Sequence, residues 1–316
     1  MSPKPTAGET APVIVVAGPT ASGKSALALA LARRLGGVVI NADALQVYRD
    51  LRIVTARPTP EDEALAPHRL YGILDASEVC SAGRWRTLAL AEIARARAAG
   101  LRPIVVGGTG LYVEALVRGL ADIPPVPAAI RAGVRARLAD LGPATLHAAL
   151  AADDPETAAT LRPSDPQRLA RAWEVLEATG RPLAAWWAEA KAAVTERFDI
   201  VALEPPREAL YATCDTRFAA MVAAGALAEV RALVARSLPP DAPALKAVGV
   251  AELARHIAGR CDLPEAVAAA RQATRRLAKR QLTWFRHRLP REGETAIRLS
   301  LKYSVVDSDE IFSKIS

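Results

Sequence analysis

Residues 18–25 constrain the fold of this chain most, because they read Gly-Pro-Thr-Ala-Ser-Gly-Lys-Ser directly after the apolar run 13–16. The spacing G-x-x-x-x-G-K-S between a strand and a helix is that of a phosphate loop, whose glycines let successive backbone N–H groups converge on an anion. A helix expected to begin at Lys24 adds the positive end of its dipole. The residues expected to bind a diphosphate group are Gly18, Pro19, Thr20, Ala21, Ser22, Gly23, Lys24 and Ser25.

Two side chains of this loop have further chemistry. The Lys24 ammonium can reach terminal phosphoryl oxygens, and the Ser25 hydroxyl stands where a phosphate-bridging Mg²⁺ needs an oxygen ligand. Mg²⁺ is therefore the expected cofactor, with Ser25 as its protein ligand. A phosphate loop specifies what is held and not what is transferred, so the neighbouring segments must identify the reaction.

Two more apolar strands are expected to end at the edge of the sheet where the phosphate loop lies. Residues 38–40 run into Asn-Ala-Asp, which ends at Asp43, and residues 103–106 run into Gly-Gly-Thr, which ends at Thr109. In parallel α/β sheets, ligands bind at the carboxyl ends of the strands. Asp43 has three interpretations: a Mg²⁺ partner, a general base, or the N-cap of a helix over residues 44–49. The Asp that ends this second strand in nucleotide hydrolases is absent.

The alternation of strands and helices predicts an α/β fold, a P-loop NTPase-like parallel sheet core with an inserted helical subdomain. The expected strands are residues 13–17, 38–41, 103–106 and 198–203. The expected core helices are residues 24–35, 84–99, 110–118, 207–222, 226–236, 247–258 and 264–287.

The sequence Ile-Pro-Pro-Val-Pro at 123–127 interrupts this alternation, and helical sequence punctuated by Pro and Gly follows it. We predict a discontinuous core of residues 12–120 and 195–290, with the C-terminal helices in its second part. Residues 121–194 are predicted to be a helical insertion. Residues 1–11 and 292–316 are predicted to be tails, the second either flexible or an edge strand.

Composition narrows the possible partners. The 316 residues carry a net charge of +7 and a sequence pI of about 9.6, which suits a polyanionic partner. The three cysteines are widely separated and form no C-x-x-C, so neither a disulfide framework nor a zinc site is expected. Because reduced thiols are typical of the cytoplasm, a cytoplasmic location is expected. We found no apolar run long enough to span a membrane and no signal peptide, so no membrane association is expected.

Seven ordered motifs over roughly residues 12–290 resemble those of bacterial tRNA dimethylallyltransferases. They are the phosphate loop (18–25), Asn-Ala-Asp-Ala-Leu-Gln-Val-Tyr (41–48), Thr-Ala-Arg-Pro-Thr (55–59), Pro-His-Arg-Leu (67–70), Val-Gly-Gly-Thr-Gly-Leu-Tyr (106–112), Asp-Pro-Gln-Arg-Leu-Ala-Arg (165–171) and Arg-Arg-Leu-Ala-Lys-Arg-Gln-Leu-Thr-Trp-Phe (275–285). The resemblance implies transfer of a dimethylallyl group from dimethylallyl diphosphate to N6 of the adenine 3′ of the anticodon in tRNA. The phosphate loop then holds diphosphate and not ATP. The expected partners are dimethylallyl diphosphate and the tRNA anticodon stem-loop, and a monomer is expected. The resemblance also implies that the helical insertion of residues 121–194 grips tRNA.

The resemblance also implies residue roles. Asp43 is the candidate base that accepts the N6 proton, and Lys24 stabilises the leaving diphosphate. Thr109 matches a family threonine near both, and Gln46 matches the residue that reads the adenine edge. The residues expected to contact tRNA are Asp43, Ala44, Leu45, Gln46, Thr109, Arg131, Gln167, Arg168, Leu169, Ala170, Arg171, Lys246 and Gly249.

Several interpretations stay open at this stage. Arg131 could be an ordinary helix charge, and Arg168 and Arg171 could pair with carboxylates. The cations of residues 271–280 form either a phosphate-binding stripe or a solvated face. Trp284 and Phe285 either stack on bases or pack into the core.

Three positions depart from the family pattern: Ala44 stands for the usual Ser, Val54 for Gly and Val250 for Tyr.

Three other functions compete with the tRNA enzyme. A prenyltransferase acting on a free adenine nucleotide would share the diphosphate grip but would not need an extensive RNA-binding insertion. A small-molecule kinase would bind ATP on the same loop. A non-catalytic RNA-binding module would need no phosphate loop.

Overall fold

The computed structural model describes residues 11–191, 194–289 and 296–300. Contacts divide the chain into two compact units, one formed by residues 118–195 and the other by the residues before and after it. The larger unit is therefore discontinuous in sequence. The boundaries expected for the insertion, 121 and 194, differ from those of the smaller unit by three residues or fewer.

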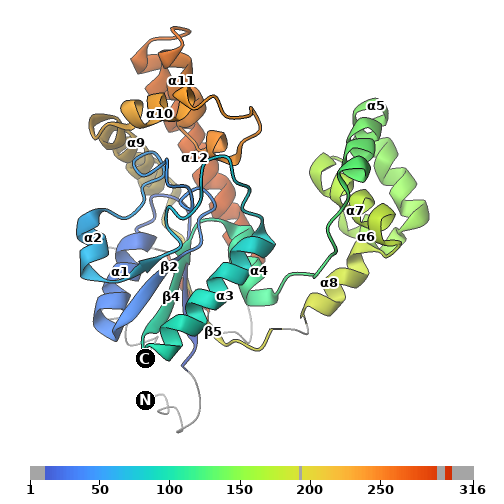
Figure 1. Cartoon of the computed structure of the whole chain (residues 1–316), viewed down its shortest axis with the longest axis horizontal. Helices are drawn as coiled ribbons and strands as arrows, with labels where there is room; N and C mark the ends of the chain where they lie inside the picture. Colours follow the sequence, from blue (N-terminus) through green and yellow to red (C-terminus); the bar gives the residue numbers. More distant parts are fainter. Residues whose placement is uncertain (1–10, 192–193, 290–295, 301–316) are drawn as a thin grey trace. The chain divides into compact units, whose positions relative to one another are not determined.

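A parallel sheet forms the centre of the larger unit (Figure 1). Its strands are β1 (Val13–Ala17), β2 (Gly37–Asn41), β3 (His68–Arg69), β4 (Arg102–Gly107), β5 (Phe198–Leu203) and β6 (Ala296–Leu299), in the spatial order β3-β2-β4-β1-β5-β6. Because β1 lies between β4 and β5, the loop after β1 reaches the middle of the carboxyl edge. The chain crosses from β1 over β4 to β2, and such crossovers open a ligand crevice at that edge.

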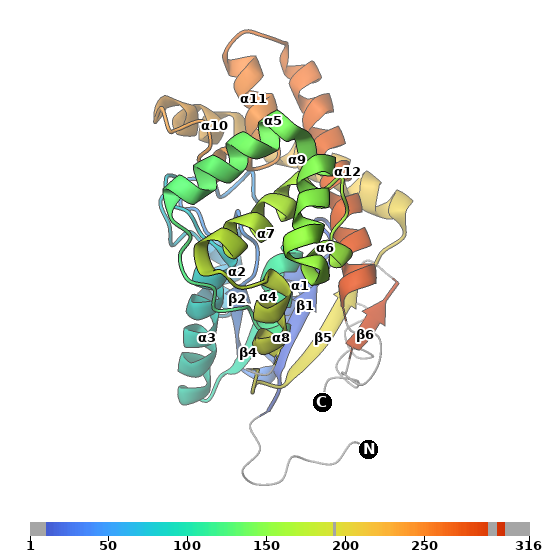
Figure 2. The same ribbon diagram turned by 90° about the vertical axis from the view of Figure 1, so that its right-hand side faces the viewer.

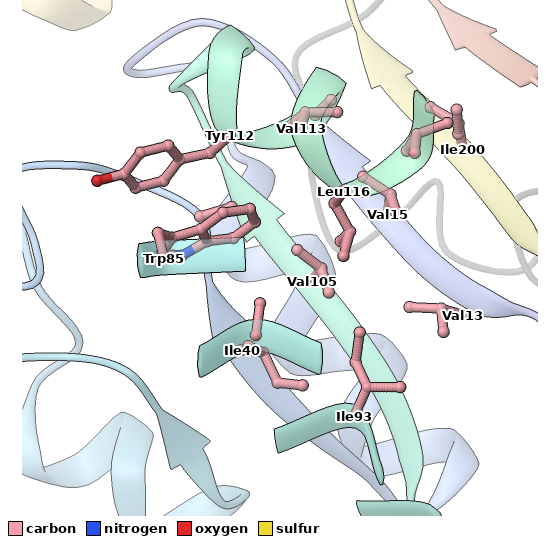
Figure 3. Close-up of a cluster of buried hydrophobic side chains, with 14 of the residues drawn as sticks. Val13, Val15, Ile40, Trp85, Ile93, Val105, Tyr112, Val113, Leu116 and Ile200 are labelled. Atoms are coloured by element: carbon pink, nitrogen blue, oxygen red, sulfur yellow. The ribbon is translucent and has the colours of Figure 1, made fainter. Parts of the chain in front are cut away.

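Both faces of the sheet are covered, which explains why the strands are continuous apolar runs. Val13 and Val15 face α3 (Ala82–Ala98), α4 (Gly110–Arg118) and the end of α12 (Leu263–Arg288), whereas Ile14 and Val16 face α1 (Lys24–Leu35). On the first face the rings of Trp85 and Tyr112 stack with centroids 4.5 Å apart (Figure 3). This packing fixes α3 and α4 next to the loops that follow β2 and β4.

Further helices of the larger unit pack around a second apolar cluster, together with the segment that follows β2. They are α9 (Arg207–Ala223), α10 (Ala226–Ala235), the 3-10 helix η1 (Pro243–Lys246), α11 (Val250–Ile257) and α12. Among the described residues, no single helix is long and apolar enough to cross a membrane. The pair α9 and α10, bent by 69° at their junction, is long and apolar enough when the two helices are taken together, judged by length and composition alone.

The smaller unit has its own core. Its helices are α5 (Ala128–Asp153), α6 (Pro155–Thr160), α7 (Pro166–Thr179) and α8 (Leu183–Lys191), shown from a second direction in Figure 2. Helix α5 breaks at Gly142, which has a φ of 75° and is followed by Pro143. Leu146, Leu150 and Trp173 pack together inside this unit.

Three local expectations were wrong or incomplete. The short α2 (Pro60–Leu65) and the two-residue β3 were not expected, because six and two residues are too few for a periodic pattern. Residues 44–47 form turns, so Asp43 does not cap a helix there. The helix expected at 247 begins at Val250, after η1. Residues 296–299 form the edge strand β6, which confirms one of the two forms expected for this tail, and residues 301–316 lie outside the described part.

Candidate active site

The phosphate loop has the compact form that its sequence predicts. Gly23 precedes α1 with a φ of 90°, and Ala21 adopts a positive φ of 66° that costs free energy for a residue with a Cβ. A Cβ on Gly18 would lie 2.9 Å from the Ser22 hydroxyl and 3.0 Å from the Leu203 carbonyl oxygen. The Ser22 hydroxyl is fully buried and has no partner among the described residues. The loop is therefore tightly wrapped in front of α1.

A hydrogen bond holds the side chain of Lys24 over this loop, and the side chain can still carry a positive charge. Its Nζ donates to the Pro19 carbonyl oxygen at 3.2 Å. Burial lowers the pKa of Lys24 to about 8, while the Asp43 carboxylate acts to raise that pKa and the Arg217 guanidinium acts to lower it. An anion on the loop would restore the full ammonium, because a nearby negative charge favours the protonated form.

Backbone contacts bring Asp43 and Thr109 to one place, as the strand ends predicted. The Thr109 hydroxyl oxygen accepts from the Ala44 N–H at 2.9 Å, and the Asp43 Oδ1 accepts from the Leu45 N–H at 3.0 Å. Asn41 Oδ1 accepts from the Asp43 N–H at 2.8 Å. Thr109 thus orients the loop that carries Asp43, and the Ala44 amide is fixed although the family's usual serine hydroxyl is absent.

Two residues that sequence reasoning missed join the helical part of the larger unit to the phosphate loop. Arg217 on α9 donates to the Thr20 hydroxyl. Gln281 on α12 accepts from the Thr20 N–H at 2.8 Å and donates to the Gly108 carbonyl oxygen at 2.8 Å. Gln281 lies inside a quoted motif, but nothing in its spacing signals contacts with both loops. Arg217 lies in no motif.

A pocket opens beside these groups. Its lining includes polar groups of Thr20, Asp43, Arg217 and Gln281. Apolar side chains supply much of the rest of the lining: Leu45, Val54, Phe218, Met221, Val248 and Leu277. A phosphate loop next to an apolar lining suits an apolar group that carries a diphosphate.

The segment after Asp43 is braced in a way that the sequence did not indicate. The Gln46 amide donates both Nε2 hydrogens, to the carbonyl oxygens of Thr55 at 2.8 Å and Ala56 at 2.9 Å. Glu229 on α10 accepts from the N–H groups of Arg52, Ile53 and Val54 at 2.6, 2.8 and 2.8 Å. Gln46 was expected to offer both a donor and an acceptor to adenine, but its donor is occupied in this arrangement.

The expected tRNA-contacting residues of the smaller unit differ in accessibility. Arg131, Gln167, Arg168 and Arg171 are exposed. Arg168 pairs with Asp165 at 3.5 Å and Arg171 with Glu174 at 3.7 Å. Leu169 and Ala170 are buried on the inner face of α7, so their side chains face the core of the smaller unit. Contact of these two residues with tRNA stays a prediction.

The two expected contact residues of the larger unit also separate. Lys246 is exposed at the end of η1. Gly249 is buried, has a φ of 99°, and a Cβ on it would lie 2.7 Å from the Phe218 ring. Gly249 therefore allows the start of α11 to pack closely against Phe218, and its contact with tRNA stays a prediction.

The donor set fits Mg²⁺ only if the substrate supplies most of the ligands. Ser25 is exposed at the start of α1, and Asp43 offers a carboxylate nearby. Within the described ranges there is no group of three or more His, Cys, Asp or Glu residues that could hold a metal ion. Mg²⁺ commonly keeps several waters and binds through one or two protein oxygens and substrate phosphates, which matches these residues.

Comparisons with known proteins agree on one family. The family model described as IPP transferase matches residues 46–288. The chain is 58% identical over 282 residues to a tRNA dimethylallyltransferase of Rhodospirillum centenum, covering 89% of this chain and 90% of the relative. It is 57% identical over 285 residues to one of Rhodopseudomonas palustris, covering 90% and 89%.

Solved structures give the same result. A full-length tRNA isopentenylpyrophosphate transferase from Bacillus halodurans matches with a TM-score of 0.68 and 30% identity over 97% of each chain. A eukaryotic dimethylallyltransferase acting on tRNA matches with a TM-score of 0.76 and 28% identity, over 87% of this chain and 70% of the other.

Proposed function

Because this chain belongs to the IPP transferase family, we propose that it transfers a dimethylallyl group from dimethylallyl diphosphate to tRNA. The acceptor we propose is N6 of the adenine 3′ of the anticodon. One observation carries the proposal: a single pocket brings together Asp43, the phosphate-loop residue Thr20 and an apolar lining. The loop would hold the diphosphate while the apolar side chains surround the allyl group.

The proposed reaction breaks the bond between C1 of the dimethylallyl group and its diphosphate oxygen, and the electron pair leaves with diphosphate. A bond then joins C1 to adenine N6, and the N6 proton passes to Asp43. An exocyclic amine of adenine is a weak nucleophile because its lone pair is delocalised into the ring. A carboxylate that accepts the proton as the C–N bond forms therefore lowers the barrier.

Charge on the departing diphosphate would be stabilised by groups already in place. Lys24 and Arg217 both lie close enough to Asp43 to interact with it electrostatically, and Arg217 also bonds Thr20 in the phosphate loop. Such preorganised cations act where charge develops in the transition state. Mg²⁺, with Ser25 as its protein ligand, would supply further charge neutralisation on the diphosphate oxygens.

Thr109 and Gln281 would act by positioning. Thr109 holds the Ala44 amide behind Asp43, and Gln281 links the phosphate loop to the Gly108 carbonyl. Together they would set the distance between the proposed base and the diphosphate. The target adenine would leave its stack in the anticodon loop to reach this point, at a cost of a few kcal/mol.

We propose a monomer as the acting form. All three cysteines are free, which is consistent with our proposal of a cytoplasmic location.

An acceptor assay separates this function from its competitors. The protein is incubated with Mg²⁺, labelled dimethylallyl diphosphate, unmodified tRNA and AMP, and a parallel reaction contains labelled ATP. Label from dimethylallyl diphosphate should appear in tRNA and not in AMP. Label in AMP alone would identify a prenyltransferase of free nucleotides. Transfer from ATP with no prenyl transfer would identify a kinase.

A further inference from the structure

A carboxylate on α10 holds the main chain of one wall of the pocket. Glu229 is half-buried, and its oxygens accept from three successive N–H groups, those of Arg52 at 2.6 Å, Ile53 at 2.8 Å and Val54 at 2.8 Å. Oε1 accepts from the first two, and Oε2 accepts from the third. Hydrogen bonds accepted by a carboxylate are stronger than those between neutral groups, so Glu229 fixes this turn to α10.

The turn reaches the pocket through Val54. The Val54 side chain is 6% exposed and lines the pocket, and Thr55 lines it as well. A Cβ on Gly249 would lie 3.5 Å from Val54 Cγ1 and 2.7 Å from the Phe218 ring, so these three residues pack at one place. While Glu229 holds the main chain of the turn, this wall of the pocket has little freedom to move.

The wall belongs to the part of the pocket that is left for a hydrocarbon. Thr20 of the phosphate loop and Asp43 supply polar lining, whereas Val54, Phe218 and Met221 belong to one apolar cluster. The pocket has a volume of about 60 Å³, so a hydrocarbon inside it touches the walls. Because the phosphate loop takes the diphosphate, the apolar lining is what remains to contact the dimethylallyl group.

We propose that Glu229 is a positioning residue for prenyl transfer, because its carboxylate holds Val54 against the dimethylallyl group. This inference rests on the proposed function. Among the described residues, Glu229 is not part of the pocket lining, so it acts through the N–H groups of the turn. Those bonds go to the turn and not to the phosphate loop. The effect of Glu229 therefore falls on the hydrocarbon of the substrate and not on its diphosphate.

The test compares the dissociation constants of dimethylallyl diphosphate and inorganic diphosphate, measured on the full chain with Mg²⁺ and without tRNA. Glu229→Gln keeps the shape of the side chain but replaces one oxygen by an NH₂ group, so it cannot accept from all three N–H groups. The matched control is Glu92→Gln on α3, which removes the same charge from a carboxylate that is 13% exposed and pairs with Arg69 and Arg95. Circular dichroism confirms that each variant is folded at the temperature of the measurement.

Glu229→Gln should raise the dissociation constant of dimethylallyl diphosphate about tenfold, because a displaced wall loses apolar contact with the substrate. The dissociation constant of inorganic diphosphate should stay within about twofold of the wild type, since the phosphate loop is unchanged. Glu92→Gln should leave both dissociation constants near their wild-type values.

A second variant, Val54→Ala, keeps the N–H groups of the turn and shortens only the side chain that forms the wall. It should also weaken the binding of dimethylallyl diphosphate about tenfold. Because both substitutions act on the same contact, the double variant should bind about as weakly as either single variant, and not about 100-fold more weakly than the wild type. A carboxylate that only stabilised the fold would not give this non-additive result.

Equal weakening of both ligands by Glu229→Gln would overturn the inference, as would additive effects in the double variant. A Val54→Ala variant with wild-type affinity for dimethylallyl diphosphate would also overturn it, and this result does not depend on the folding of Glu229→Gln. In each of these cases the proposed function stands if the wild type prenylates tRNA. A wild type that binds the two ligands equally and leaves tRNA unmodified would overturn the proposed function itself.

Discussion

The lowered pKa of Lys24 predicts that the affinity for dimethylallyl diphosphate falls above about pH 8. Burial brings this pKa from 10.5 to about 8. At pH 9 only about one tenth of the free protein then carries the ammonium, so the affinity should be about tenfold lower than at pH 7, or about 1.4 kcal/mol.

The direction of this change in affinity with pH follows from the negative charge of the ligand. A bound diphosphate stabilises the ammonium and raises the pKa of Lys24, so binding takes up a proton above pH 8. The affinity should therefore be flat below the pKa of the free protein. It should fall about tenfold per pH unit above it, until the pKa of the complex is reached.

Calorimetric titration with dimethylallyl diphosphate in the absence of tRNA, from about pH 6.5 to about pH 9.5, measures this dependence. Two buffers with different ionisation enthalpies count the protons taken up. Lys24→Arg is the matched control, because a guanidinium stays charged over this range and should remove the decline. A wild-type affinity that is constant to pH 9.5, or the same decline in Lys24→Arg, would refute the assignment of the titrating group.

Three other substitutions test separate parts of the site. Arg217→Ala should raise the KM for dimethylallyl diphosphate about tenfold or more without changing the dissociation constant of tRNA, and an unchanged KM would exclude contact with diphosphate. Asp43→Asn should lower the single-turnover rate at least about 100-fold and leave tRNA binding within a few-fold, whereas equal loss of both would indicate a structural role. Glu229→Gln leaves one or more of the Arg52, Ile53 and Val54 N–H groups without an acceptor. It should lower the free energy of unfolding in urea by about 1–3 kcal/mol, and wild-type stability would contradict that role.

Local patterns predicted the centre of the fold and of the site. The phosphate loop specifies a strand, a turn and a helix within a short segment, and β1, the loop and α1 follow it. Asp43 and Thr109 were expected together because each follows a buried strand of one parallel sheet, and the carboxyl ends of such strands meet. The short α2 and β3 carried no comparable signal.

Contacts between distant segments were not predictable from patterns. Thr20 bonds Arg217 and Gln281, which lie 197 and 261 residues further along the chain. Position along the helix did not reveal which cations of α12 have carboxylate partners: within the described residues Arg275 and Arg286 form ion pairs, whereas the adjacent Arg276 forms none. What separates them is whether another element, such as β5 with Glu204 beside it, brings a carboxylate within reach.

The match to a motif also did not show which residues of that motif are buried. The segment 165–171 matched as a whole, yet Arg168 and Arg171 are exposed while Leu169 and Ala170 face the core of the smaller unit. A helix always divides its residues in this way, and the period of the flanking apolar residues would have identified the inner pair.

The most direct test of the account is the position of the new group in tRNA. Unmodified tRNA is reacted with dimethylallyl diphosphate and Mg²⁺, cut at specific sites, and its fragments and nucleosides are analysed by mass spectrometry. One dimethylallyl group should appear on N6 of the adenine 3′ of the anticodon, and tRNA carrying another base at that position should stay unmodified. A prenyl group elsewhere in the tRNA, or no prenyl group at all, would contradict the account.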